Sequence, residues 1–211
     1  MTAPYEAEVR FSVPDPHAFW ERIKELHGRL VLSYAFVDHV YRPRNGPWDL
    51  STRTLRIREY LLPQEGCEVL LSAADVVTVG SLPVKRARLP EGKLRLFAGD
   101  RAACERVLRE LGFAPWFCVA HTDGTRWELP THGGIILERI TGRSQDREVP
   151  MGWMGEVEVP GQDARAARAR IAAELELLGI PEELVTPYPL PLLVARALGL
   201  PSTREESGPQ A

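Results

Sequence analysis

The chain has 211 residues, with 26 Lys and Arg against 29 Asp and Glu, which gives a formal net charge of −3. This length suits a single domain that can bury a real core without disulfides or a structural metal. The near-neutral charge argues against a dedicated nucleic-acid-binding protein, and 44% hydrophobic with 26% charged residues excludes disordered and fibrous classes.

The cysteines and the distribution of apolar residues indicate in which cellular compartment we expect the protein. The cysteines are odd in number and form no CxxC pair, so we expect small buried hydrophobes in a reducing compartment. Glu6, Glu8 and Arg10 interrupt the N-terminal region before any apolar run starts, so we expect no signal peptide. No uncharged stretch reaches the ~18 residues that a membrane-spanning helix needs. We therefore expect a cytoplasmic protein that does not contact a membrane. The cysteines are Cys67, Cys104 and Cys118.

In the first half of the chain, stretches that alternate between polar and apolar residues surround two helical patterns. Residues 5–13 alternate without a slip, and Asp15 then caps a helix that ends at Gly28. Asp100 caps a second helix, which Gly112 closes. Strands are predicted at residues 30–42, 53–61, 67–79, 84–89 and 93–98.

The second half again places strands before helices. Strands are predicted at residues 115–121, 124–130, 134–141 and 153–159, a helix at 163–178, and helical turns after Pro181 and over 188–199. This order predicts an α+β fold with eight or more strands. We expect one domain over residues 1–200 and a polar, flexible tail over 201–211.

Charged residues recur at every second position of several predicted strands. Glu-x-Glu occurs in the first and the last of these strands, and Arg-x-Arg occurs between them. On any one strand, such a face is most simply a solvated surface. Because the pattern recurs on separate strands, it favours a sheet closed into a barrel whose lumen collects these side chains. The pairs are Glu6/Glu8, Glu156/Glu158, Arg56/Arg58 and Arg86/Arg88, with Lys93/Arg95 and Arg126/Glu128 as further same-face pairs.

A lumen with both kinds of charge predicts a binding site for a polyphosphate bridged to a metal ion. Carboxylates gathered closely repel one another unless a divalent cation lies among them, and oxygen ligands select Mg²⁺ or Mn²⁺. Guanidinium groups bind phosphate oxygens bidentately. The cation would neutralise the charge that develops on a transferring phosphoryl group.

Several short motifs, in order, resemble those of the CYTH superfamily, the triphosphate tunnel metalloenzymes. The Glu6-x-Glu8-x-Arg10 strand is similar to the family's ExExK signature, and Leu55-Arg56-Ile57-Arg58 matches its LRIR strand. The other matching segments are Asp38–Tyr41, Leu111–Phe113, Leu137–Gly142, Gly155–Glu158, and Leu178–Ile180 followed by Tyr188. The resemblance extends from residue 6 to about residue 193.

This resemblance implies a closed antiparallel β-barrel, or tunnel, of about eight strands with flanking helices and a C-terminal helical extension. It implies a divalent-metal-dependent enzyme, like a class IV adenylate cyclase or a triphosphatase, that cleaves or cyclises a nucleoside, thiamine or inorganic triphosphate. The partner would be this small molecule, with no nucleic acid or membrane, and the protein would be a monomer or homodimer. The implied metal ligands for Mg²⁺ or Mn²⁺ are Glu6, Glu8, Glu138, Glu156 and Glu158. The implied phosphate-binding residues are Arg10, Arg56, Arg58, Arg86, Arg88 and Arg126, and the implied catalytic residues are Arg10 and His121.

Two departures from the family pattern weaken the expectation of catalysis. Arg10 stands where the family has a lysine, and arginine binds phosphate but cannot give up its proton to act as a general base. Ala74 stands where the family's LTxK strand has its lysine. One alternative is therefore a degenerate module that binds a phosphate or nucleotide without turnover. Another is a structural or partner-binding protein whose lumen charges only pair with each other.

Overall fold

The computed structural model describes residues 5–79, 82–89, 92–131, 133–161, 163–186 and 188–201. Among them, side chains are described for all except residues 5–7, 76–79, 82–87, 160, 161 and 164. The predicted tail over 201–211 therefore lies outside the described residues, apart from Pro201.

The described chain consists of β-strands with four α-helices between and after them. The strands are β1 (Tyr5–Ser12), β2 (Arg29–Pro43), β3 (Arg53–Leu62), β4 (Gly66–Val79), β5 (Leu82–Ala87), β6 (Lys93–Gly99), β7 (Phe113–Glu128), β8 (Gly134–Arg143), β9 (Glu148–Gly161) and β10 (Val185–Thr186). The helices are α1 (Pro16–Glu25), α2 (Arg101–Glu110), α3 (Ala164–Leu178) and α4 (Leu190–Ala197), with a short 3₁₀ helix, η2 (Glu182–Leu184). None of the described helices is long and apolar enough to span a membrane.

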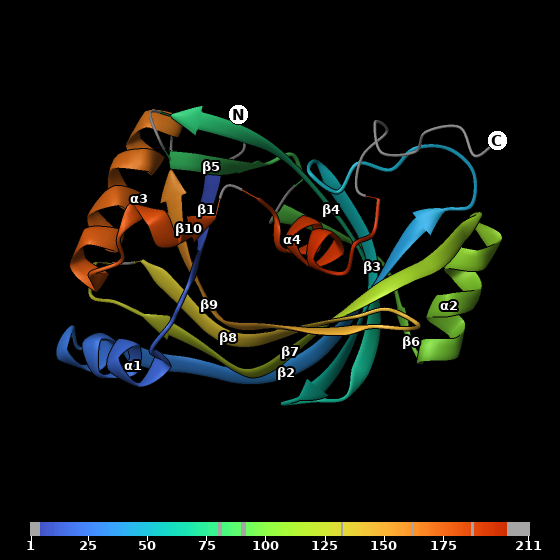
Figure 1. Cartoon of the computed structure of the whole chain (residues 1–211), viewed down its shortest axis with the longest axis horizontal. Helices are drawn as coiled ribbons and strands as arrows, with labels where there is room; N and C mark the ends of the chain where they lie inside the picture. Colours follow the sequence, from blue (N-terminus) through green and yellow to red (C-terminus); the bar gives the residue numbers. More distant parts are fainter. Residues whose placement is uncertain are drawn as a thin grey trace.

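All described strand pairs are antiparallel and form one sheet, and this sheet is open. The order is β10-β1-β9-β8-β7-β2-β3-β4-β5, with β6 paired to β4 off this path. The prediction of a closed barrel is therefore wrong. β1 and β5 lie side by side (Figure 1), but among the described residues no hydrogen-bonded ladder joins them.

The way the edge strands are used explains why the barrel does not close. β4 pairs with β6 over Cys67–Ser72 and then with β5 over Ala74–Val79, so its outer edge is divided between two short partners. At the other end of the sheet, β1 pairs with the two-residue strand β10 through Arg10 and Phe11. Closure requires a continuous ladder between the two end strands, and these short partners do not provide one.

The sheet is strongly curved, and side chains alternate between its two faces. Figure 1 shows α4 on the concave side, α1 and α3 near one end, and α2 at the other. On β1, Val9 and Phe11 are buried in the hydrophobic core, whereas Glu8 and Arg10 point into a cavity on the concave side. Period-2 alternation thus puts core and cavity residues on the same strands.

The convex face is covered by helices at both ends. At one end, α1 and α3 pack on β1, β8 and β9 through a core that includes Phe11, Ile23, Leu137 and Ile171. At the other end, α2 places Cys104 and Leu108 against β3 and β4. Asp15 and Asp100 cap α1 and α2 as predicted, since each side chain accepts a hydrogen bond from a backbone N–H of the first turn.

Helix α4 packs on the concave face and closes one side of the cavity. Leu192 and Val194 lie in a core with Val40, Phe117 and Ile140 of β2, β7 and β8. The cavity is also lined by Pro189, Leu190 and Pro191 at the start of this helix.

Two predicted strands form one strand in the structure. The segment 115–121 and the segment 124–130 as far as Glu128 belong to the single strand β7. The register with β8 shifts between Thr122 and Thr125, where Asp123 has φ of 54°. Asp tolerates this left-handed conformation better than most residues, so the chain kinks there without leaving the sheet.

Candidate functional site

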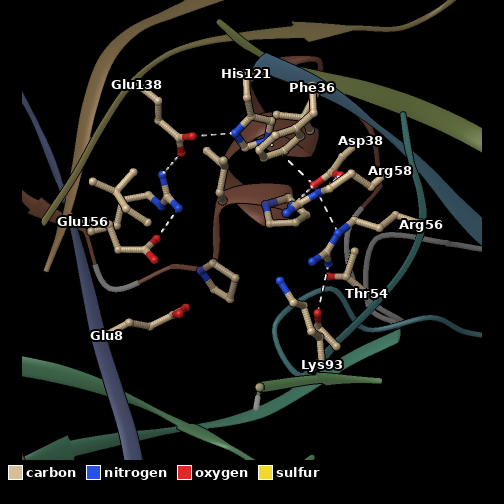
Figure 2. Close-up of a pocket in the computed structure, with 18 of the residues that line it drawn as sticks. Glu8, Phe36, Asp38, Thr54, Arg56, Arg58, Lys93, His121, Glu138 and Glu156 are labelled. Carbon is tan, nitrogen blue, oxygen red and sulfur yellow. Dashed lines mark hydrogen bonds and ion pairs between the residues drawn. The ribbon is translucent and has the colours of Figure 1, made fainter. Parts of the chain in front are cut away.

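The concave face holds a cavity of about 420 Å³. Its lining comes from strands β1, β2, β3, β4, β6, β7, β8 and β9 and from the start of α4. Small-molecule sites have volumes of roughly 300–1,000 Å³, so this cavity is large enough for a small ligand. Figure 2 shows Glu8, Glu138 and Glu156 on one side of it, and Arg56, Arg58 and Lys93, together with Asp38, on the other. We call these sides the carboxylate wall (Glu8, Glu138, Glu156, Glu158) and the cation wall (Arg56, Arg58, Lys93).

Three members of the carboxylate wall could hold a metal ion together. Each of Glu8, Glu156 and Glu158 offers one ligand atom, and the three atoms lie within 4.8 Å of one another. They come from the paired strands β1 and β9, where Glu8 lies directly opposite Glu158. Because all three donors are carboxylate oxygens, the set fits a hard cation such as Mg²⁺ or Mn²⁺. Arg126 forms an ion pair of 3.2 Å with Glu158 at the exposed rim.

Arg10 lies within the carboxylate wall and forms ion pairs with two of its members. Its Nη1 donates to Oε1 of Glu138 at 2.7 Å, and its Nη2 donates to Oε2 of Glu156. The other oxygen of Glu138, Oε2, accepts from the Tyr34 hydroxyl at 2.8 Å and lies 2.8 Å from Nδ1 of His121. Both oxygens of Glu138 are therefore bound by protein groups.

These contacts determine the charge states of the buried groups. Burial opposes ionisation of Glu138, but His121 and Arg10 outweigh it and lower the pKa of this carboxyl well below its usual range. Glu138 is therefore an anion that only accepts hydrogen bonds, and Nδ1 of His121 is the donor. Burial lowers the pKa of Arg10, but Glu156 and Glu138 raise it by more, so Arg10 is a permanent cation.

Across the cavity, Asp38 holds the two arginines of the cation wall. Arg58 donates to it through Nε and Nη2, both at 2.8 Å, and Nε of Arg56 lies 3.1 Å from its Oδ2. Arg58 also lies over the Phe36 ring, 3.7 Å from its centroid. Burial raises the pKa of Asp38, but Arg58 and Arg56 outweigh this effect and the pKa falls well below its usual range.

The cation wall carries more positive charge than Asp38 neutralises. Lys93 points into the cavity beside Thr54 and Arg56 (Figure 2), and no carboxylate of the described residues forms an ion pair with it. Burial, and then the like charges of Arg58 and Arg56, lower the pKa of Lys93. Burial and Arg58 also lower the pKa of Arg56. An anion bound here would relieve this repulsion.

The structure brings most of the predicted site residues together. Those that line the cavity are Glu8, Arg10, Arg56, Arg58, His121, Arg126, Glu138, Glu156 and Glu158. Arg88 does not line it, since its side chain is 57% exposed and lies 3.9 Å from Asp75. Arg95 is also exposed and contacts Glu68. The side chains of Glu6 and Arg86 lie outside the described residues, so their roles stay predictions.

Several cavity residues were not among the predicted site residues. They include Tyr34, Phe36 and Asp38 of β2. Their even-numbered positions put them on one face of the strand, and this period was the signal that could have identified them. Phe36 also stacks on His121, with ring centroids 4.1 Å apart.

A scan against protein-family models finds no match, and no curated protein is similar to the sequence. Solved structures do match. A protein from Pyrococcus horikoshii OT3 is 14% identical with a TM-score of 0.67, over 91% of this chain and 99% of that one. A candidate adenylate cyclase from Vibrio parahaemolyticus is 13% identical with a TM-score of 0.62, over 93% and 100% of the two chains.

A third match is a candidate adenylyl cyclase from Hippeastrum, described as revealing a dominant triphosphatase activity. It is 14% identical with a TM-score of 0.56, over 93% of this chain and 97% of that one. The chain has the fold of these proteins. Two of these matches are described as candidate adenylate cyclases, a kind of protein that the sequence motifs also resemble, and the likeness is one of fold. At these identities the likeness does not extend to a substrate or an activity.

Proposed function

We propose that the cavity binds a triphosphate together with one divalent metal ion, Mg²⁺ or Mn²⁺, and that the protein cleaves or cyclises this triphosphate. The observation that carries the proposal is the opposition of two charged walls in one cavity. Glu8, Glu156 and Glu158 offer oxygen ligands on one side, and Arg56 and Lys93 offer cations on the other. A metal-bound polyphosphate is a ligand that complements both walls at once.

The proposed roles follow from the position of each side chain. Glu8, Glu156 and Glu158 would hold the metal ion, which when bound neutralises charge on the phosphoryl group. Arg56 and Lys93 would bind phosphate oxygens, and Asp38 orients the Arg56 guanidinium from behind.

The catalytic role of His121 stays a prediction. Its Nδ1 donates to Glu138, its Nε2 lies 3.8 Å from Asp38, and Phe36 covers its ring. In this arrangement His121 lies between the two walls, hydrogen-bonded to Glu138 and near Asp38.

A second candidate function is phosphate binding without turnover. It is favoured by Ala74, which lines the cavity where the family resemblance places a lysine. Lys93 supplies an ammonium to the same cavity, and it lies opposite Ser72 on the strand next to β4. The binding charge is therefore retained even though the position of the lysine has changed.

The test is incubation of the protein with ATP, thiamine triphosphate or tripolyphosphate and Mg²⁺ or Mn²⁺, followed by separation of the products. We expect phosphate, pyrophosphate or a cyclic nucleotide from at least one substrate, and loss of product in Glu8→Gln. Calorimetric binding of the triphosphate without any product would favour the binding module. Neither product nor binding would contradict both functions.

A matched pair of arginine variants separates the site from general charge. Arg56→Met removes a cation from the cavity, whereas Arg88→Met removes an exposed cation outside it. We expect Arg56→Met to weaken triphosphate binding by at least tenfold and Arg88→Met to change it by less than twofold. Equal effects would show that binding depends on the net charge of the protein and not on the cavity.

A further inference from the structure

We propose that Arg10 is a built-in cation that occupies the second cation position of the carboxylate wall, so that the protein takes up one divalent ion and not two. The inference rests on the proposed function, because it concerns the metal ion of the same site. It assigns Glu138 to the binding of Arg10, whereas the sequence predicted it as a metal ligand.

The first argument is the occupancy of the Glu138 oxygens. Oε1 accepts from Arg10, and Oε2 accepts from both Tyr34 and His121. The Glu138 side chain is 2% exposed, so solvent does not compete for these contacts. An ion between Glu138 and Glu156 would have to lie on the Arg10 nitrogens, where like charge and contact distance both exclude it.

The second argument is that a carboxylate has two oxygens. Glu156 accepts from Arg10 through Oε2, and it also offers a ligand atom close to those of Glu8 and Glu158. Glu156 therefore lies between the guanidinium and the metal position. In this arrangement Arg10 fixes the rotamer of a metal ligand, and we class it as a positioning residue.

The experiment counts Mn²⁺ ions bound per chain, by titration with the electron paramagnetic resonance signal of free Mn²⁺ as the readout. We expect one ion for the unaltered protein and for Arg10→Lys, which keeps a cation between the two carboxylates. Arg10→Met removes this cation and should add a second, weaker site. Two ions in the unaltered protein would overturn the inference and leave the proposed function standing, whereas none would overturn the metal site of the proposed function itself.

A second pair of variants keeps the test decisive if Arg10→Met does not fold. Glu138→Gln should leave the Mn²⁺ dissociation constant within about twofold, because this side chain binds Arg10 and not the ion. Glu8→Gln should weaken Mn²⁺ binding by at least tenfold. A tenfold loss in Glu138→Gln would show that Glu138 is a metal ligand and would overturn the assignment of Arg10.

Discussion

Asp38 forms ion pairs with both arginines of the cation wall, so its removal tests the electrostatics of this wall directly. The variant Asp38→Asn keeps the size of the side chain and removes its charge. It leaves Arg56 and Arg58, whose side chains are 11% and 15% exposed, next to each other without their shared carboxylate.

The expected loss of stability follows from the burial of this cluster. Breaking a buried ion pair costs about 3–5 kcal/mol, and the residual exposure of both arginines favours the lower end of this range. For a chain of this size, 1 kcal/mol corresponds to roughly 2–4 °C in Tm, so we expect Tm to fall by about 6–12 °C. Chemical denaturation gives the free energy of unfolding, and calorimetry gives the Tm.

Asp75→Asn is the matched control. Asp75 pairs with Arg88 at 3.9 Å, and both side chains are at least half exposed. A pair of this kind contributes about 0–1 kcal/mol. Added tripolyphosphate should raise the Tm of Asp38→Asn more than that of the unaltered protein, because it supplies the anion that the arginines have lost. If Asp38→Asn and Asp75→Asn were equally stable, the view that Asp38 holds a buried cation pair would be refuted.

Three further predictions concern pH and packing. The pKa values of Asp38 and Glu138 are lower in the folded protein than in the unfolded chain, so the stability that these carboxylates contribute is present above about pH 4–5 and is lost at lower pH. On lowering the pH to about 3, the free energy of unfolding should therefore fall less in Glu138→Gln than in the unaltered protein. The lowered pKa of Lys93, caused by burial and the two neighbouring arginines, predicts that triphosphate affinity falls as pH rises from neutral towards about 10, and that Lys93→Met lacks this decline in calorimetric titrations. Gly155→Ala would place its Cβ 2.3 Å from the Phe11 ring, so we expect it to lose about 1–3 kcal/mol in denaturant titrations, and an unchanged midpoint would contradict this packing.

The strand faces could be predicted from the sequence because alternation has a physical cause in the pleat of a strand. Glu8 and Arg10 reach the cavity while Val9 and Phe11 enter the core, as the pattern over residues 5–13 indicated. The closure of the sheet could not be predicted in this way. Alternation states which face a residue occupies, but it does not state whether the last strand edge finds a partner.

The arrangement of charges within the site also could not be predicted from the sequence. Arg10 and Glu138 are separated by 128 positions, and no local pattern relates them. The two strands that carry them are both next to β9 in the sheet order, and this neighbourhood brings the side chains together. Arg88 shows the opposite error, because a charged alternation alone did not distinguish an exposed position just after β5 from one that lines the cavity.

The open path of the sheet has a mechanical consequence for the ligand. Glu8 lies on β1 and Arg56 on β3, and the strands β9, β8, β7 and β2 stand between them in the ladder order. The distance between the two walls therefore depends on the bend of the whole sheet and on the contact between β1 and β5. A ligand that contacts both walls ties the two halves of the sheet to each other across the hollow side. Its binding energy would favour one curvature of the sheet over the others, so the width of the cavity and the occupancy of the site are coupled.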